Sequence, residues 1–231
     1  MMNKYDVFLF DADNTLFDFE KAEESALKSL FEEAEITYSL SAANKYKEIN
    51  NALWAEFERG ETTKEALQIL RFSRLAEYLN INMDGAKLNK LYITALGKCA
   101  FLVDGAEVLC KTLYKAQKSI YIITNGISVV QKSRLANSCI KQYISDIFVS
   151  EDVGFQKPHI SYFDYVLAHI PAVEKEKILV IGDSLSADIK GGINAGIDAC
   201  WFNINKTENK SGTTPTYTIN SLDEFLRIIQ D

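Results

Sequence analysis

The sequence has few of the residues that build zinc sites or disulfide frameworks. It contains four cysteines and two histidines among 231 residues, and no two cysteines form a C-x-x-C pair. A structural zinc site is therefore not expected, because such sites take four closely spaced cysteine and histidine ligands. We interpret the cysteines as small buried hydrophobic residues of a protein kept in a reducing compartment.

Positive charge and long apolar runs are also scarce. The chain has 25 lysine and arginine residues against 32 aspartate and glutamate residues, which gives a formal net charge of −7. This balance argues against nucleic acid or an anionic membrane as the main partner, although a placed lysine or a bound cation would still admit a small anion. No stretch approaches the roughly 20 apolar residues of a membrane span, and no signal-peptide pattern opens the chain. We therefore expect a cytoplasmic protein.

Short apolar runs predict strands, and helical patterns lie between the later ones. The strand-like runs are residues 5–10, 119–123, 146–149, 177–181 and 198–202. The helical patterns are 105–117, 127–139, 159–170 and 185–195, and a last strand and helix fall within 216–229. Alternating strands and helices predict an α/β fold with a parallel sheet made of β-α-β units.

The long gap between the first two strands predicts four amphipathic helices instead, around 20–35, 41–57, 62–80 and 86–98. Ser41, Thr62 and Asp84 are candidate N-caps, and Thr62 with Glu65 fits the capping-box spacing. These helices are either additions to the core or a separate inserted module. The second interpretation is favoured, because an insertion just after the first strand would stand over the carboxyl ends of the strands as a lid does.

Acidic residues follow the first predicted strand directly. Asp11 and Asp13 lie one residue apart in the run Phe10-Asp11-Ala12-Asp13-Asn14-Thr15-Leu16. The carboxyl ends of strands are where open α/β sheets bind their ligands. Taken alone, both residues could also be ordinary turn formers.

Two further motifs follow later strands. The run Ile122-Ile123-Thr124-Asn125-Gly126 ends a strand with a hydroxyl, an amide and a glycine before a helix, which is a suitable arrangement for binding an anion. Alternatively, Thr124 is a helix N-cap. Lys157 comes just before a proline that is expected to start a helix. Taken alone, Lys157 would be a solvated loop charge.

The fourth motif again places an acid at a strand end. Asp183 follows the run Val180-Ile181-Gly182, and Asp188 lies five residues further on, in the first turn of a predicted helix. Asp188 alone could simply stabilise the helix dipole. Together the four motifs bring a nucleophile, a proton donor, a metal site and an anion site to one crevice.

These motifs, in this order, resemble those of the haloacid dehalogenase-like hydrolase superfamily. The run from Asp11 to Leu16 is similar to its first motif, Thr124 to its second, Lys157 to its third, and Asp183 with Asp188 to its fourth. Asn14 departs from the glycine that many members carry. The resemblance implies a Rossmann-like core, residues 1–17 and 99–231, with an inserted helical (C1-type) cap, residues 18–98.

The resemblance also implies a reaction. Dehalogenase members lack an acid two residues after the nucleophile, so the acid at Asp13 indicates a phosphatase or phosphomutase. By resemblance, Asp11 attacks phosphorus and forms an aspartyl-phosphate, while Asp13 protonates the leaving oxygen and later takes a proton from water. Mg²⁺ would be held by the Asp11 side chain, the Asp13 carbonyl and Asp183.

The resemblance assigns supporting roles to the remaining motif residues. Lys157 and Thr124 would hold phosphate oxygens, aided by backbone N–H groups that include that of Asn125. Asp188 would orient Lys157 or support the metal site.

A finer resemblance points to one branch, the noncanonical pyrimidine nucleotidases. It is carried by the first-motif run, Leu53-Trp54, the run ending Thr124-Asn125-Gly126, and Gly191-Gly192-Ile193-Asn194-Ala195-Gly196 leading to Cys200-Trp201-Phe202-Asn203. It implies hydrolysis of nucleoside 5′-monophosphates, including modified pyrimidine nucleotides. The alternatives are a phosphoglycolate or sugar-phosphate phosphatase, a phosphomutase, a 2-haloacid dehalogenase, or a binding module without activity.

Several side chains in the helical segment could bind a nucleobase. They are Trp54, Phe57, Arg71, Phe72, Arg74 and Tyr78. The favoured interpretation is that the aromatic residues form the core of the segment and the arginines its solvated face, because aromatic stripes at helical spacing are usually core.

Overall fold

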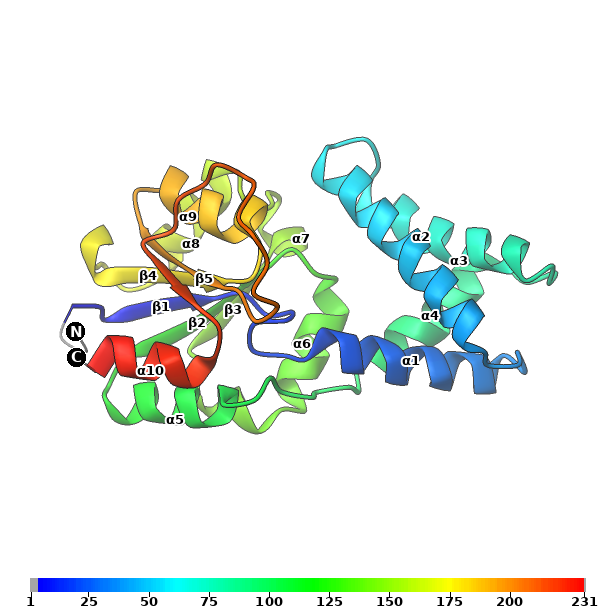
Figure 1. The fold of residues 1–231 in the computed structure, drawn as a ribbon, viewed down its shortest axis with the longest axis horizontal. Helices are drawn as coiled ribbons and strands as arrows, with labels where there is room; N and C mark the ends of the chain where they lie inside the picture. Colours follow the sequence, from blue (N-terminus) through cyan, green and yellow to red (C-terminus); the bar gives the residue numbers. More distant parts are fainter. Residues whose placement is uncertain (1–3, 231) are drawn as a thin grey trace. The chain divides into compact units, whose positions relative to one another are not determined.

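The computed structural model describes residues 4–230, the last two by their backbone alone. Its core is a six-stranded sheet in the order β3-β2-β1-β4-β5-β6, and every neighbouring pair is parallel (Figure 1). The strands are β1 (Val7–Phe10), β2 (Ser119–Thr124), β3 (Asp146–Val149), β4 (Ile178–Gly182), β5 (Asp198–Phe202) and β6 (Tyr217–Ile219). The predicted α/β class is confirmed.

Side chains of the strands alternate between two buried faces. Phe8 and Phe10 join the hydrophobic cluster under α5 (Ala106–Lys115) and α10 (Leu222–Gln230), whereas Val7 and Leu9 join the cluster under α8 (Ile160–His169) and α9 (Lys190–Asn194). Figure 1 shows these helix pairs on opposite sides of the sheet. Because both faces are covered, the strands are continuously hydrophobic, which is why short apolar runs predicted them well.

The strand order reverses next to β1. From β1 the chain passes outward to β2 and β3, then returns to the other side of β1 for β4, β5 and β6. The Asp11 N–H donates to the Ile181 carbonyl at 2.8 Å, so the pairing of β1 with β4 extends to Asp11 itself. Such a reversal opens a crevice at the carboxyl ends of the strands, and it places Asp11 there.

The remaining core helices depart from prediction at their ends. The predicted helix 127–139 becomes α6 (Ser128–Ala136) followed by a 3-10 turn (Cys139–Tyr143), and 185–195 divides into a π-helical turn (Leu185–Ile189) and α9. Pro158 precedes α8 instead of starting it, because His159 is the N-cap and its Nδ1 accepts from the Ser161 N–H. The four-residue α7 (Ser150–Val153) was not predicted, since it is too short to show a period.

The chain divides into two compact units, Met1–Phe19 with Ala100–Asp231, and Glu20–Cys99. The helices of the second unit are α1 (Phe19–Glu33), α2 (Leu40–Glu58), α3 (Lys64–Tyr78) and α4 (Gly85–Leu96). Asp84 caps α4 as predicted. The other two predicted caps are wrong: Ser39 and Thr63 cap α2 and α3, because their hydroxyls accept from the N–H groups three residues on.

The interior of the helical unit is more polar than its sequence suggested. Phe72 is core as predicted, but Tyr78 is exposed. Arg74 lies at the surface beside Glu56, as expected for a solvated arginine. Arg71 is buried, so the prediction that it is solvated is wrong. The Arg71 guanidinium donates to the side chains of Asn50 and Asn89 and lies over two aromatic rings.

Within residues 4–230, no helix combines the length and the apolar character needed to cross a bilayer.

Candidate active site

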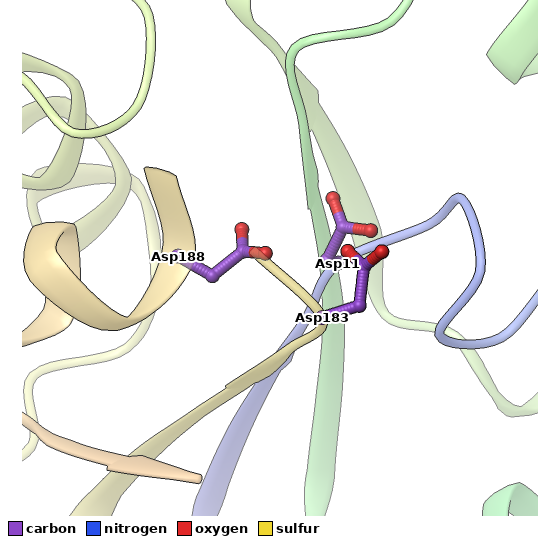
Figure 2. A group of neighbouring side chains, drawn as sticks. All are labelled: Asp11, Asp183 and Asp188. Atoms are coloured by element: carbon purple, nitrogen blue, oxygen red, sulfur yellow. The ribbon is translucent and has the colours of Figure 1, made fainter. Parts of the chain in front are cut away.

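Three carboxylates meet at the carboxyl ends of β1 and β4. Asp11 follows β1, Asp183 follows β4, and Asp188 comes from the π-helical turn. One oxygen of each lies within 4.8 Å of the others, and Figure 2 shows Asp188 directed toward the other two. A Cβ at Gly182 would lie 2.2 Å from Asp188 Oδ2, so only glycine at this strand end admits the Asp188 carboxylate.

Lys157 binds two of these carboxylates. Its Nζ donates to Asp11 Oδ1 at 2.6 Å, to Asp188 Oδ1 at 2.6 Å and to the Ile123 carbonyl at 2.8 Å. The side chain is buried, which rules out the interpretation as a solvated loop charge. Asn125 holds the backbone of Lys157 in place, since its amide donates to the Lys157 carbonyl and accepts from the Lys157 N–H, both at 2.9 Å.

The cluster brings three carboxylates together with the ammonium group of Lys157. Burial raises the pKa of Asp11 well above 3.8, Lys157 opposes this rise, and the neighbouring Asp188 and Asp183 add to it. Burial and the charge of Asp188 raise the pKa of Asp183 to about 7. Burial acts to lower the pKa of Lys157, but Asp11 and Asp188 outweigh it, and the net change is upward. The lysine therefore remains an ammonium ion.

Thr124 lies at the end of β2, and it is not a helix N-cap. Its side chain is buried and its Oγ1 accepts from the Gly126 N–H at 3.0 Å, while α6 begins only at Ser128. The Thr124 N–H donates to the hydroxyl of Tyr162, and this hydroxyl donates in turn to the Phe148 carbonyl at 2.7 Å. Tyr162 thus joins α8 to the ends of β2 and β3.

Asp13 is not one of the three clustered carboxylates, and its side chain is bound from α6. One carboxylate oxygen accepts from Gln131 Nε2 at 2.5 Å, and the other accepts from Arg134 Nη1. Asn14, the next residue, has a φ of +59° and its N–H donates to the Phe17 carbonyl at 2.7 Å. Asparagine tolerates this left-handed conformation better than most residues, which accounts for its place where many family members carry glycine.

The structure therefore brings Asp11, Lys157, Asp183 and Asp188 into one cluster, with Asn125 supporting Lys157. Sequence reasoning did not single out Tyr162, Gln131 and Arg134. For the last two a signal was present, since residues three apart on a helix share a face and this helix follows the Thr124 motif.

Comparison with known proteins places this arrangement in a family. Residues 8–202 match the family model of the haloacid dehalogenase-like hydrolases. The chain is a haloacid dehalogenase-like hydrolase. The predicted superfamily is thereby confirmed on a match that includes all four motifs.

Three similar proteins are nearly full-length relatives of this hydrolase. The HAD-hydrolase YfnB of Bacillus subtilis is 43% identical over 99% of this chain and 97% of its own length. A crystal structure of YfnB bound to magnesium covers 99% of this chain and 100% of its own, with a TM-score of 0.93. The pyrimidine 5′-nucleotidase PynA of Streptococcus pneumoniae is 37% identical, over 96% and 94% of the two chains. The pyrimidine 5′-nucleotidase YjjG of Escherichia coli is 34% identical over 98% of each.

The donor set of this hydrolase fits a hard divalent cation. Asp11, Asp183 and Asp188 offer carboxylate oxygens within 4.8 Å of one another, and Mg²⁺ takes oxygen ligands at 2.0–2.1 Å. Among residues 4–230 Lys157 forms ion pairs with Asp11 and Asp188, and Asp183 forms none. A cation beside Asp183 would offset the mutual repulsion of these carboxylates, which adds to the effect of burial in raising their pKa values.

Proposed function

We propose that this chain is a Mg²⁺-dependent phosphatase of nucleoside 5′-monophosphates, in particular pyrimidine nucleotides including noncanonical ones, and that it acts through an aspartyl-phosphate. As an enzyme it is a phosphoric monoester hydrolase. The observation that carries the proposal is the buried Lys157 ammonium, 2.6 Å from both Asp11 and Asp188, at the strand ends where Asp183 also lies. The names of PynA and YjjG support the choice of nucleotides as substrates.

Asp11 and Asp13 divide the chemistry between them. An Asp11 oxygen attacks phosphorus, the bond from phosphorus to the ester oxygen breaks, and Asp13 transfers a proton to the departing oxygen. In the second step the Asp13 carboxylate takes a proton from water, whose oxygen attacks the aspartyl-phosphate. Inorganic phosphate leaves and Asp11 is restored. Asp13 suits both steps because its side chain is partly exposed, whereas Asp11 is buried.

Lys157 and Thr124 would bind the phosphate oxygens. Lysine has three N–H donors, and all three have acceptors here: Asp11, Asp188 and the Ile123 carbonyl. A phosphate oxygen can therefore take its place on Nζ by replacing the bond to Asp11, which would also release the Asp11 oxygen for attack. Asp188 keeps the ammonium in position throughout, because its other oxygen is fixed by the Ser184 N–H.

Asp11, Asp183 and the backbone carbonyl of Asp13 would hold the cation, and Asp188 lies beside Asp11 and Asp183. When bound, Mg²⁺ would neutralise charge as two anions approach each other. At an effective dielectric of about 20, two unit charges ~4 Å apart repel by roughly 4 kcal/mol, and several such pairs arise when a phosphate enters.

The test is inorganic phosphate release, with Mg²⁺ and with chelator, from a substrate panel. The panel contains UMP, dUMP, dTMP, a 5-halogenated dUMP, purine monophosphates, phosphoglycolate and hexose phosphates. We expect metal-dependent turnover that is concentrated on the pyrimidine monophosphates. Preference for phosphoglycolate or hexose phosphates would keep the chemistry and overturn the substrate.

The covalent step has its own test. Asp11→Asn should abolish turnover and prevent the gain of one phosphoryl group that intact-mass spectrometry detects during turnover of the wild type. Asp6→Asn is the matched control, since Asp6 precedes the same strand at its opposite end and pairs with Lys118 at the surface. It should leave turnover unchanged. Full activity in Asp11→Asn would refute the aspartyl-phosphate.

A further inference from the structure

Two buried side chains of α6 bind the carboxylate of Asp13. Gln131 and Arg134 are almost fully buried, at 2% and 0% relative exposure. Gln131 Nε2 donates to Asp13 Oδ2 at 2.5 Å, and Arg134 Nη1 donates to Asp13 Oδ1. Each oxygen of Asp13 therefore has its own donor, which fixes the orientation of the carboxylate.

Gly126 and Phe17 lie next to this pair of side chains. A Cβ at Gly126 would lie 2.3 Å from Gln131 Nε2, so the glycine after Asn125 makes room for this amide. The Arg134 guanidinium carbon lies 4.7 Å from the centre of the Phe17 ring. Within residues 4–230, the bond to Asp13 is the one hydrogen bond of the Gln131 side chain, and its Oε1 is buried without a partner. Burying an amide in this way is costly, which points to a role at Asp13.

We propose that Gln131 and Arg134 are positioning residues for proton transfer by Asp13. The proposal rests on the general-acid role proposed for Asp13 above. In the orientation of the structure both groups donate to Asp13, so together they favour the carboxylate over the carboxylic acid, which would present a hydrogen on one oxygen. When Asp13 gives its proton to the departing ester oxygen, negative charge develops on the Asp13 carboxylate, to which two preorganised donors already point, and the transition state is stabilised.

A purely structural role for the pair makes a different prediction. If Gln131 and Arg134 only pack α6 against the first strand, their loss should slow all substrates alike. If they act through Asp13, the loss should matter where the leaving oxygen needs a proton. An alkyl phosphate such as a nucleoside 5′-monophosphate needs one, whereas p-nitrophenolate leaves without it.

The experiment measures kcat/KM for p-nitrophenyl phosphate and for the best alkyl phosphate, in the wild type and in Gln131→Leu, Arg134→Met and Arg134→Lys. We expect kcat/KM for the alkyl phosphate to fall about tenfold or more beyond any loss with p-nitrophenyl phosphate in Gln131→Leu and Arg134→Met. Arg134→Lys should recover part of the loss, because it keeps a cationic donor. Lys132→Ala is the matched control on the same helix, since Lys132 pairs with Asp152 at the surface, and it should behave as wild type.

A double-mutant cycle with Asp13→Asn tests whether Gln131 acts through Asp13. If the pair acts through Asp13, Gln131→Leu should cause no further loss in the Asp13→Asn background. Equal losses for both substrates, or losses that add to that of Asp13→Asn, would overturn the inference while the function of Asp13 stands. If Asp13→Asn itself fails to discriminate the two substrates, the proposed acid role fails and the inference falls with it. Gln131→Leu carries the same prediction should Arg134→Met not fold.

Discussion

Replacing Glu23 by glutamine tests the electrostatics of the helical unit. Glu23 is a buried carboxyl on α1, and its Oε1 accepts from Asn50 Nδ2 at 3.2 Å. Burial raises its pKa to about 7, while the charges of Lys47 and Arg71 oppose this rise and Glu20 adds to it. Glutamine has the same shape and keeps the acceptor, but it carries no charge at any pH.

The sign and size of the effect follow from proton linkage. Between the ordinary value of 4.5 and about 7, the folded protein holds a proton on Glu23 that the unfolded chain has lost. The stability associated with this proton is present below pH 4.5 and disappears as the pH rises through 7. At 1.36 kcal/mol for each unit of pKa, the wild type loses about 3 kcal/mol of unfolding free energy over this range. Glu23→Gln should avoid that loss.

Urea denaturation, followed by circular dichroism and tryptophan fluorescence from pH 4 to pH 8, measures the difference. Glu23→Gln and wild type should be about equally stable near pH 4, and the variant should be more stable by up to about 3 kcal/mol at pH 8. Glu24→Gln is the matched control one residue away. The exposed Glu24 pairs with Lys28, which lowers its pKa, so Glu24 has no rise in pKa from burial for the glutamine to remove.

A difference between Glu23→Gln and wild type that stays constant with pH would refute this reasoning. So would a wild type that is the more stable protein at pH 8. That result would mean that Arg71 and Lys47 stabilise an ionised Glu23 by more than its burial costs.

Three further substitutions test the core unit. Tyr162→Phe should lower the unfolding free energy by about 2 kcal/mol in urea titrations, because it removes a buried hydroxyl that joins the Thr124 N–H to a carbonyl of β3; an unchanged midpoint would contradict this. Gly182→Ala should reduce phosphate release about tenfold or more, because the added Cβ would lie only 2.2 Å from Asp188 Oδ2 and would displace this carboxylate. Wild-type turnover in this variant would refute the role proposed for Asp188. Asn14→Ala should cost about 1 kcal/mol of stability and Asn14→Gly little, because the φ of +59° disfavours alanine; equal stability of the two would count against it.

The core was predictable from the sequence because its strands are buried on both faces. Continuous apolar runs such as Ile178–Gly182 have no competing interpretation once helices alternate with them. Helix ends were less predictable. Thr62 and Thr63 are both acceptable caps by residue type, and the choice between them depends on which hydroxyl reaches an N–H group, a difference of one residue that composition does not record.

Polar residues inside the fold were the hardest to interpret. Arg71 and Arg74 lie on the same helix and look alike in sequence, yet Asn50 and Asn89 on two other helices make burial possible for Arg71 alone. A buried charge is tolerated only where partners are present, and those partners are distant along the chain.

The residues of the candidate site differ in the same way in how far the sequence reveals them. Asp11, Thr124 and Asp183 could be located because each stands at the end of a strand, and the parallel topology brings strand ends together. Gln131 and Arg134 follow no strand; they reach Asp13 from the middle of α6, through space that Gly126 leaves open. A sequence reading confined to strand ends finds the groups that would react with the phosphate. Finding the groups that hold them requires knowing which face of a helix is turned toward the site. In α6 this is the face that carries Gln131 and Arg134, which lie three residues apart and both bind Asp13.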